Sequence, residues 1–476
     1  MSVTPCDARP LADDQNLHDF LQTCQEKCQA SNQRLIVSIT QAIFAVEPLT
    51  ILQQFTTDQE RVFYWENQQQ NSAISAWGSC IEKKIISADR FQQTEDFINE
   101  YRDSILETGD TSLPEVGAKF LTNLTFFEAA SLSSLLPSVT IFIPKWQITR
   151  SHQSCFLTYN CFLSPTVNII EIKETIKKQM QKIETFSQSS IRFYFPQISS
   201  FTNQLEKAAL NKRHPFEKAV KLALEDIQQQ KLTKIVLSHH LDVVASLPFD
   251  PFLSLNYLRQ KYPDCYIFLV GDGQGNNFIG ATPERLFSLR KQTLISDALA
   301  GSAARGKNSI EDEKLAQTLL SSEKERREHN AVSSYIIQQL KQLGLTPEAS
   351  RRQLLKLNNI QHLWTVIKAE VPTEINPIEI VAKLHPTPAV AGVPTAIACE
   401  KIREYETFDR AFYAAPIGWL DGKGNAEFMV GIRSAMIQKN QARLYAGAGI
   451  VAGSNPKKEL AEIQLKLQAM LKALRS

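Results

Sequence analysis

Three charged side chains near the end of the sequence have the spacing of a binding surface. Glu459, Glu462 and Lys466 occupy positions i, i+3 and i+7 of an expected helix over 456–474, so they share one face. The opposite face is apolar and would pack on the core through Leu460, Ile463, Leu467 and Met470. By spacing alone, the charged face fits a solvated stripe with a Glu462–Lys466 ion pair as well as it fits a site.

A second acidic segment, SSEKERREHNAV (321–332), also has a helical pattern. Glu328 and His329 stand just before the apolar pair Ala331–Val332, a position that can turn them inward. Carboxylates from two helices could together hold a hard cation, and oxygen ligands favour Mg²⁺ over zinc or copper. These charges too fit a solvated face, because spacing cannot bring two distant helices together.

Two glycine-rich segments resemble phosphate-binding turns. GDGQGN (271–276) contains a GxGxG pattern, and GAGIVAGS (447–454) follows a strand and precedes the expected C-terminal helix. A dinucleotide fold needs a further strand and an acidic residue, and the remaining residues all have a helical pattern, which argues against it. The 447–454 turn could instead bind a carboxylate through backbone N–H groups, or be only a tight strand-to-helix connection.

Composition narrows the class of protein. The chain has 476 residues, 43% of them hydrophobic, and a formal net charge of +2, which is ordinary for a globular protein and argues against nucleic-acid binding. The eight cysteines form no CxxC pair and are expected to be reduced thiols. The acidic N-terminal segment does not resemble a signal or transit peptide, and no apolar run reaches membrane-spanning length. A cytoplasmic protein without a membrane partner is therefore expected.

Periodicity predicts a mixture of helices and strands. Helical patterns cover 11–30, 89–106, 165–190, 215–230, 311–342 and 456–474, and strand patterns cover 34–40, 61–65, 139–144 with 147–149, 234–238, 241–244, 266–270 and 278–280. Residues 187–205 are the expected linker. This alternation favours an α+β or α/β fold with large sheets.

A series of nine segments resembles the chorismate-utilising enzymes, a family that includes isochorismate, salicylate, anthranilate and aminodeoxychorismate synthases. In order they are KIVLS (234–238), FIGATPERL (278–286), SDALAGSAARG (296–306), SEKERREH (322–329), HLWT (362–365), LHPTPAVAGVP (384–394), YETFDRAFYAAPIGW (405–419), VGIRSA (430–435) and YAGAGIV (445–451) with KKELAEIQLK (457–466). The resemblance implies one large α/β (α+β) unit. It would be a sandwich of two facing sheets flanked by helices, with 1–204 as the N-terminal half and 205–476 as the chorismate-binding catalytic core.

The resemblance also implies roles for particular residues. Lys234 would be the base that activates water, and Glu284 the acid that protonates the leaving hydroxyl. A lysine acts as a base only in its neutral form, which requires burial or a neighbouring cation. Mg²⁺ would be the cofactor, held by Glu328, Glu459 and Glu462. The substrate-binding residues would be Gly301, Ser302, His385, Arg433, Ala448, Gly449 and Lys466.

Three positions favour one branch of the family. In the resemblance, Lys234 matches the water-activating lysine that anthranilate synthases usually lack. Ala300 stands where some aminodeoxychorismate synthases carry a nucleophilic lysine, and Ser302 stands where salicylate synthases typically have threonine. These residues favour a reversible chorismate isomerisation without a glutaminase partner. The long N-terminal half and the absence of a transit peptide resemble a bacterial enzyme of menaquinone or phylloquinone formation, and a monomer is expected. Salicylate formation, amine transfer and a non-catalytic chorismate-binding protein are the alternatives.

Overall fold

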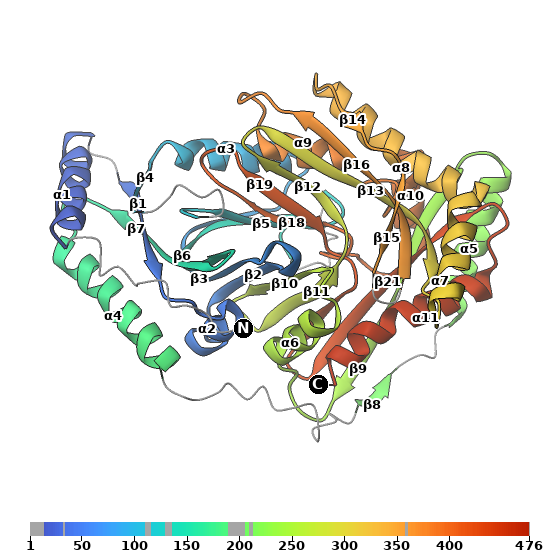
Figure 1. Ribbon diagram of the computed structural model, residues 1–476, viewed down its shortest axis with the longest axis horizontal. Coiled ribbons are helices and arrows are strands. Elements are labelled where there is room, and N and C mark those ends of the chain that lie inside the picture. Colours follow the sequence, from blue (N-terminus) through green and yellow to red (C-terminus); the bar gives the residue numbers. More distant parts are fainter. Residues whose placement is uncertain are drawn as a thin grey trace.

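The strands of the protein form one hydrogen-bonded network that divides into two branches (Figure 1). The computed structural model describes residues 14–31, 34–109, 116–128, 136–188, 205–208, 213–357 and 360–475. All strand pairs in these residues are antiparallel except the parallel pair β1–β4.

The first branch crosses the whole molecule. Its strands, in order of pairing, are β4 (Ile105–Gly109), β1 (Leu35–Ile43), β7 (Ser154–Leu163), β6 (Val139–Ser151), β3 (Ser72–Ile85), β2 (Arg61–Asn67), β10 (Tyr266–Asp272), β11 (Asn276–Thr282), β20 (Ser434–Gln438), β21 (Gln441–Val451) and β9 (Lys234–Ala245), with β8 (Leu205–Ala208) and β17 (Gly392–Val393) beside β9.

The second branch leaves the first at β6. It runs through β5 (Phe120–Leu124), β18 (Pro416–Leu420), β19 (Ala426–Val430), β12 (Arg285–Arg290), β13 (Thr293–Ala304) and β16 (Ile360–Glu370), and β14 (Glu348–Ala349) and β15 (Gln353–Lys356) both pair with β16.

The two branches face one another across an aromatic core. Trp65 of β2 packs edge-on against Trp419 of β18, with ring centroids 6.4 Å apart. Tyr266 of β10 donates a hydrogen bond of 2.8 Å to Glu427 of β19. All four side chains are buried, so these contacts bind the two layers of a sandwich together.

Helices cover the outer faces of the sheets. At one end of Figure 1, α1 (Asp14–Ser31) and α4 (Ile169–Gln188) lie together beside β1. At the other end, α8 (Glu323–Gln342) packs on β13, and α11 (Pro456–Ala473) packs on β21 and α5 (Arg213–Gln228). The remaining helices are α2 (Pro48–Phe55), α3 (Arg90–Arg102), α6 (Pro251–Lys261), α7 (Ser309–Ser321), α9 (Pro377–Leu384) and α10 (Thr395–Tyr405).

The structure confirms the expected two-sheet α+β sandwich and corrects some of its details. The helix expected over 89–106 ends at Arg102, and Leu106 lies in β4. The segment 447–451 is not a turn, because β21 stays paired with β9 as far as Val451, opposite Lys234. The expected linker lies largely outside the described residues. The division at 204/205 stays a prediction; pairing of β2 with β10 and of β5 with β18 shows that both halves contribute to each branch.

Candidate active site

A cavity of about 580 Å³ lies where the ends of several distant segments meet. Its walls are β9, β13, β16, β21, α8 and α11, together with the segments that precede β12, β18 and β20. The sequence places most candidate residues on these elements. The lining residues that matter for chemistry are Lys234, Glu284, Gly301, Ser302, Lys324, Glu325, Glu328, His362, Tyr413, Arg433, Gly447, Gly449, Glu459, Glu462 and Lys466.

Lys234, the first residue of β9, is held inside this cavity by an ion pair. Its Nζ lies 2.8 Å from Oε1 of Glu328, and only 5% of the lysine side chain is exposed. Gly449 on the neighbouring strand leaves room for the pair, since a Cβ there would lie 3.3 Å from Lys234 Cε and 3.5 Å from Glu328 Oε1. Burial alone would raise the pKa of Glu328, but the Lys234 ammonium group reverses the shift and lowers it.

Glu284 is the most strongly perturbed carboxyl group of the cavity. It follows Pro283 at the turn between β11 and β12, and 8% of the residue is exposed. Burial raises the pKa of Glu284 to about 7, although Lys234 and Arg433 act in the opposite direction. Its carboxyl group makes no hydrogen bond within the described part of the chain, whereas its backbone N–H donates to Thr282 Oγ1 at 3.1 Å. A carboxyl group in this state can hold a proton near neutral pH and donate it.

Four carboxylates form one wall of the cavity. Glu325 and Glu328 come from α8, and Glu459 and Glu462 come from α11. Burial raises the pKa of Glu325 and of Glu459, and the negative charges of Glu328 and Glu462 respectively add to these shifts. Mutual repulsion of this kind is relieved by a cation, and all the donors are oxygen atoms. The described residues bring no three metal-ligating side chains to a single point, so the wall fits a cation by charge and donor type rather than by a closed cage.

Gly301 and Ser302 lie at a β-bulge where β13 passes α8. The pairing with β16 slips between Ala300 and Ser302, and Gly301 has φ of +77°. The bulge turns the backbone N–H of Ser302 toward Glu325 Oε2 at 3.2 Å and its hydroxyl toward His362 Nδ1 at 3.0 Å. Burial and the nearby Arg433 and Lys466 charges lower the pKa of His362 to about 3, so this imidazole is neutral.

Two cations complete the cavity. Arg433 has the left-handed φ of +50°, uncommon for a residue with a side chain, in the turn between β19 and β20. Within the described residues its guanidinium group meets one hydrogen-bonding side chain, the Cys265 thiol, at 3.9 Å. Lys466 is anchored to Gly447 O at 2.8 Å and to Glu462 Oε1 at 2.7 Å. Arg433 is therefore free to bind an anion, while Lys466 already has two partners.

Two residues expected in the site lie elsewhere. His385 does not line the cavity, and its Nε2 lies 2.9 Å from Phe126 O. Burial is the main cause that lowers the pKa of His385 to about 3, and the nearby Arg90 charge adds to it. Ala448 lies on the opposite face of β21 from Gly447 and Gly449, because side chains alternate along a strand. Neither residue lines the cavity, and their assignment to substrate binding stays a prediction.

Sequence reasoning also missed residues of the cavity, among them Glu325 and His362. Glu325 lies three positions before Glu328, which repeats the i, i+3 spacing of Glu459 and Glu462, so a signal for it was present. His362 lay within the HLWT segment without being singled out. Its neighbourhood depends on the β13–β16 register, which the sequence does not display.

The fold and the lining of the cavity are those of an enzyme class that also occurs in known proteins. A family model described as chorismate binding enzyme matches residues 19–475, and the chain belongs to this family. Isochorismate synthase MenF of Bacillus subtilis is 28% identical over 94% of this chain and 95% of its own length. The salicylate biosynthesis isochorismate synthase of Pseudomonas aeruginosa is 38% identical over 56% of each chain.

A similar fold occurs in a solved structure. The menaquinone-specific isochorismate synthase MenF of Escherichia coli superposes with a TM-score of 0.76 at 23% identity, over 96% of this chain and all of that one. At this identity the likeness concerns the fold alone.

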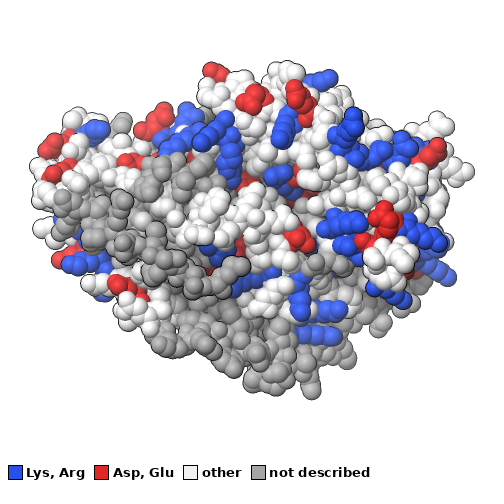
Figure 2. Space-filling model, in the orientation of Figure 1, with Lys and Arg blue, Asp and Glu red and all other residues white. Residues whose placement is uncertain are grey.

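The surface visible in Figure 2 mixes charges of both signs. No helix of the described residues is long and apolar enough to cross a membrane. Figure 2 shows basic side chains gathered toward the end of the molecule that holds α5, α7 and α8, with acidic side chains among them.

Proposed function

We propose that this protein is an isochorismate synthase, which interconverts chorismate and isochorismate. The observation that carries the proposal is that one cavity contains both a buried lysine and a buried carboxyl group that can hold a proton near neutral pH. Glu284 has a pKa of about 7, and Lys234 is close enough to influence it. Full-length similarity to a protein named isochorismate synthase supports the same conclusion.

The reaction adds a hydroxyl group at C2 of the ring and removes the one at C4. Lys234 takes a proton from water as the new C2–O bond forms and the ring double bonds shift. Glu284 gives its proton to the C4 oxygen, which leaves as water. Lys234 acts in this way only when neutral, so its ion pair with Glu328 must open in the reacting complex.

The substrate carries two carboxylates, and the cavity provides two kinds of site for them. Arg433, with no carboxylate partner among the described residues, would bind one of them, with the backbone N–H groups near Gly449 beside it. Glu328, Glu459 and Glu462 would hold Mg²⁺, with Glu325 adjacent. Bound there, the ion would neutralise the acidic wall and orient the second carboxylate.

The physiological setting is the finer part of the proposal. The role we propose is in quinone formation, menaquinone or phylloquinone, rather than siderophore formation, and full-length similarity to the Bacillus subtilis protein named MenF supports this choice. We further propose a cytoplasmic monomer that needs neither ammonia nor a glutaminase partner.

The test is to incubate the purified protein with chorismate and Mg²⁺ without ammonia, separate the products by chromatography and assay pyruvate. Isochorismate approaching an equilibrium mixture without pyruvate is the expected result. Formation of salicylate with an equal amount of pyruvate would instead indicate a salicylate synthase. Turnover that requires ammonia would indicate an amine-transferring enzyme. No turnover under any of these conditions would indicate a protein that only binds chorismate.

Metal dependence is tested separately. Chelation should abolish turnover, and added Mg²⁺ should restore it. Direct titration of Mg²⁺ by calorimetry should give one site in the wild type and a much weaker one in Glu459→Gln. The exposed Glu404→Gln is the matched control. Full activity in the presence of chelator would contradict the assignment of the acidic wall.

A further inference from the structure

Asp297 of β13 connects three strands through a single, partly buried carboxylate. Its Oδ2 accepts from Arg285 of β12, with both Nε and Nη2 at 2.9 Å. Its Oδ1 accepts from Trp364 Nε1 of β16 at 2.9 Å. The side chains of Arg285 and Asp297 are 14% and 13% exposed, so this is an interior clamp rather than a surface ion pair.

Each clamped strand carries a residue of the cavity. Arg285 directly follows Glu284, β13 leads from Asp297 to Gly301 and Ser302, and His362 lies two positions before Trp364 on β16. The pairing of β12 with β19 is irregular between Arg285 and Phe287, so the regular ladder is interrupted next to Glu284. On the β19 side, the backbone carbonyl of Glu284 still accepts a hydrogen bond of 3.0 Å from the Val430 N–H. The Arg285 side chain supplies a second constraint from the opposite strand.

We propose that Asp297 is a positioning residue for Glu284, acting through Arg285 and Trp364 to fix the start of β12 against β13 and β16. The inference deepens the proposed function and rests on it, because it assumes that Glu284 donates a proton during turnover. Asp297 is not among the residues that line the cavity, so it would act through its neighbours.

The charge of Asp297 has a second effect on the same carboxyl group. Glu284 is faced by Lys234 of β9, Arg433 of the β19–β20 turn, Tyr413 of the segment before β18, and Asp297. Burial is the main cause of the raised pKa of Glu284; the two cations oppose it and Asp297 adds to it. Removing the Asp297 charge takes away this contribution, so the pKa of Glu284 should fall.

Two variants separate position from charge. Asp297→Asn removes the charge but can still accept from Trp364, whereas Trp364→Phe removes one hydrogen bond and leaves the charge. We expect kcat to fall roughly tenfold in Asp297→Asn, with KM changed less than about twofold, because the misplaced acid affects the chemical step. The basic limb of its pH–rate profile, where Glu284 loses its proton, should move to lower pH. In Trp364→Phe kcat should fall less, and the limb should stay in place.

The ion pair between Asp242 and Arg443 provides a matched control. Asp242→Asn breaks another strand-to-strand pair, in which Arg443 meets both oxygens of Asp242 at 2.6 and 2.9 Å on the exposed side of β9 and β21. It should leave kcat and the limb unchanged. Asp297→Glu, which restores the charge, should return the limb toward the wild-type position. If Asp297→Asn does not fold, Trp364→Phe carries the test, and an unchanged kcat in that variant would overturn the positioning role. A wild-type profile in Asp297→Asn, or an equal change in the control, would overturn the proposal. If the wild-type protein formed a product other than isochorismate, the proposed function would be refuted instead. The shift of the basic limb in Asp297→Asn could still be measured with that reaction.

Discussion

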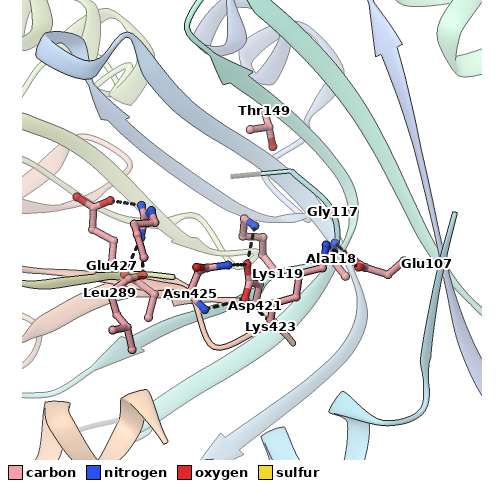
Figure 3. Close-up of polar contacts among 12 residues, drawn as sticks. Glu107, Gly117, Ala118, Lys119, Thr149, Leu289, Asp421, Lys423, Asn425 and Glu427 are labelled. Atoms are coloured by element: carbon pink, nitrogen blue, oxygen red, sulfur yellow. Dashed lines mark hydrogen bonds and ion pairs between the residues drawn. The ribbon is translucent and has the colours of Figure 1, made fainter. Parts of the chain in front are cut away.

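Buried charges are treated differently in the sandwich and in the cavity. Between the sheets, Lys119 has no exposed surface and lies 3.9 Å from Asp421 (Figure 3). Its Nζ also lies 4.5 Å from the centre of the Trp419 ring. Arg290 binds Glu427 at 2.6 Å on the same side of the core. In the cavity, by contrast, the described residues give the Glu284 carboxyl group no hydrogen bond and give Arg433 only a thiol.

The difference separates the structural charges of the sandwich from Glu284 and Arg433 in the cavity, whereas Lys234 is paired with Glu328. An ion that stays buried for stability needs a partner within the protein, because desolvation without one costs several kcal/mol. A buried ion without such a partner is stable only if solvent or a ligand reaches it. Burial of a charge therefore says little about function until its partners have been identified.

The largest effect should come from removing the unpaired acid. Glu284→Gln is expected to lower kcat by about 10²–10⁴, the usual contribution of a positioned acid, while the protein still folds. Lys234→Ala should have a similar effect. Lys231→Ala, three positions earlier and half exposed, is the control and should keep wild-type rates. Wild-type turnover in both Lys234→Ala and Glu284→Gln would refute the role assignment.

Replacing the paired charge of Lys119 should lower the stability of the protein and leave substrate binding unchanged. Lys119→Met removes the buried ammonium group beside Asp421, whose carboxylate keeps hydrogen bonds from Lys423 and Asn425. The variant is therefore expected to cost about 1.5–3 kcal/mol in the free energy of unfolding. KM for chorismate should be unchanged at a temperature where the variant is folded. Adding Asp421→Asn should recover part of the loss. If KM rose as stability fell, the separation of the two regions would be wrong.

The pH dependence of stability distinguishes the two regions without any substrate. The pKa of Glu284 rises on folding from 4.5 to about 7, so the folded state binds its proton more tightly. The stabilisation from this proton is fully present below pH 4.5 and is lost as the pH rises through 7, by roughly 3 kcal/mol. Denaturant unfolding at pH 5 and pH 8 should therefore show a smaller decline in Glu284→Gln than in the wild type. Equal declines would mean that Glu284 is not perturbed.

The smallest effect is expected at the surface. Arg443 and Asp242 form a bidentate pair, but their side chains are 40% and 48% exposed, so solvent screens it. Arg443→Ala should change the free energy of unfolding by less than about 1 kcal/mol and leave kcat unchanged. A loss as large as that of Lys119→Met would show that exposure is a poor guide to the energy of these pairs.

Residues on helices were the easiest to predict from the sequence. On α11, helical spacing separated Glu459, Glu462 and Lys466 from the apolar face, and Leu460, Ile463, Leu467 and Met470 are all buried. The helix period depends only on neighbouring residues, so the sequence contains the whole pattern.

Residues on strands were harder, because a strand has two faces and only its partners decide which one meets the cavity. Ala448 was placed in the site although Gly447 and Gly449 line it, and the strand containing them was expected to end in a turn. A shift of one residue in register exchanges the faces. His362 and the Asp297 clamp depend on the β13–β16 register in the same way, and that register requires the folded sheet.

The walls of the cavity are far apart in the order of synthesis. Lys234 begins β9, whereas Glu459 and Glu462 lie on α11, which a ribosome makes after every other wall. A nascent chain that has only reached β21 already contains the lysine, the acid and Arg433, but not the second half of its acidic wall. Domains commonly fold during translation as units, yet this unit stays open on one side until α11 has emerged. Turnover should therefore begin with the docking of this helix, and truncated chains that end before it should be inert even where their sheets have formed.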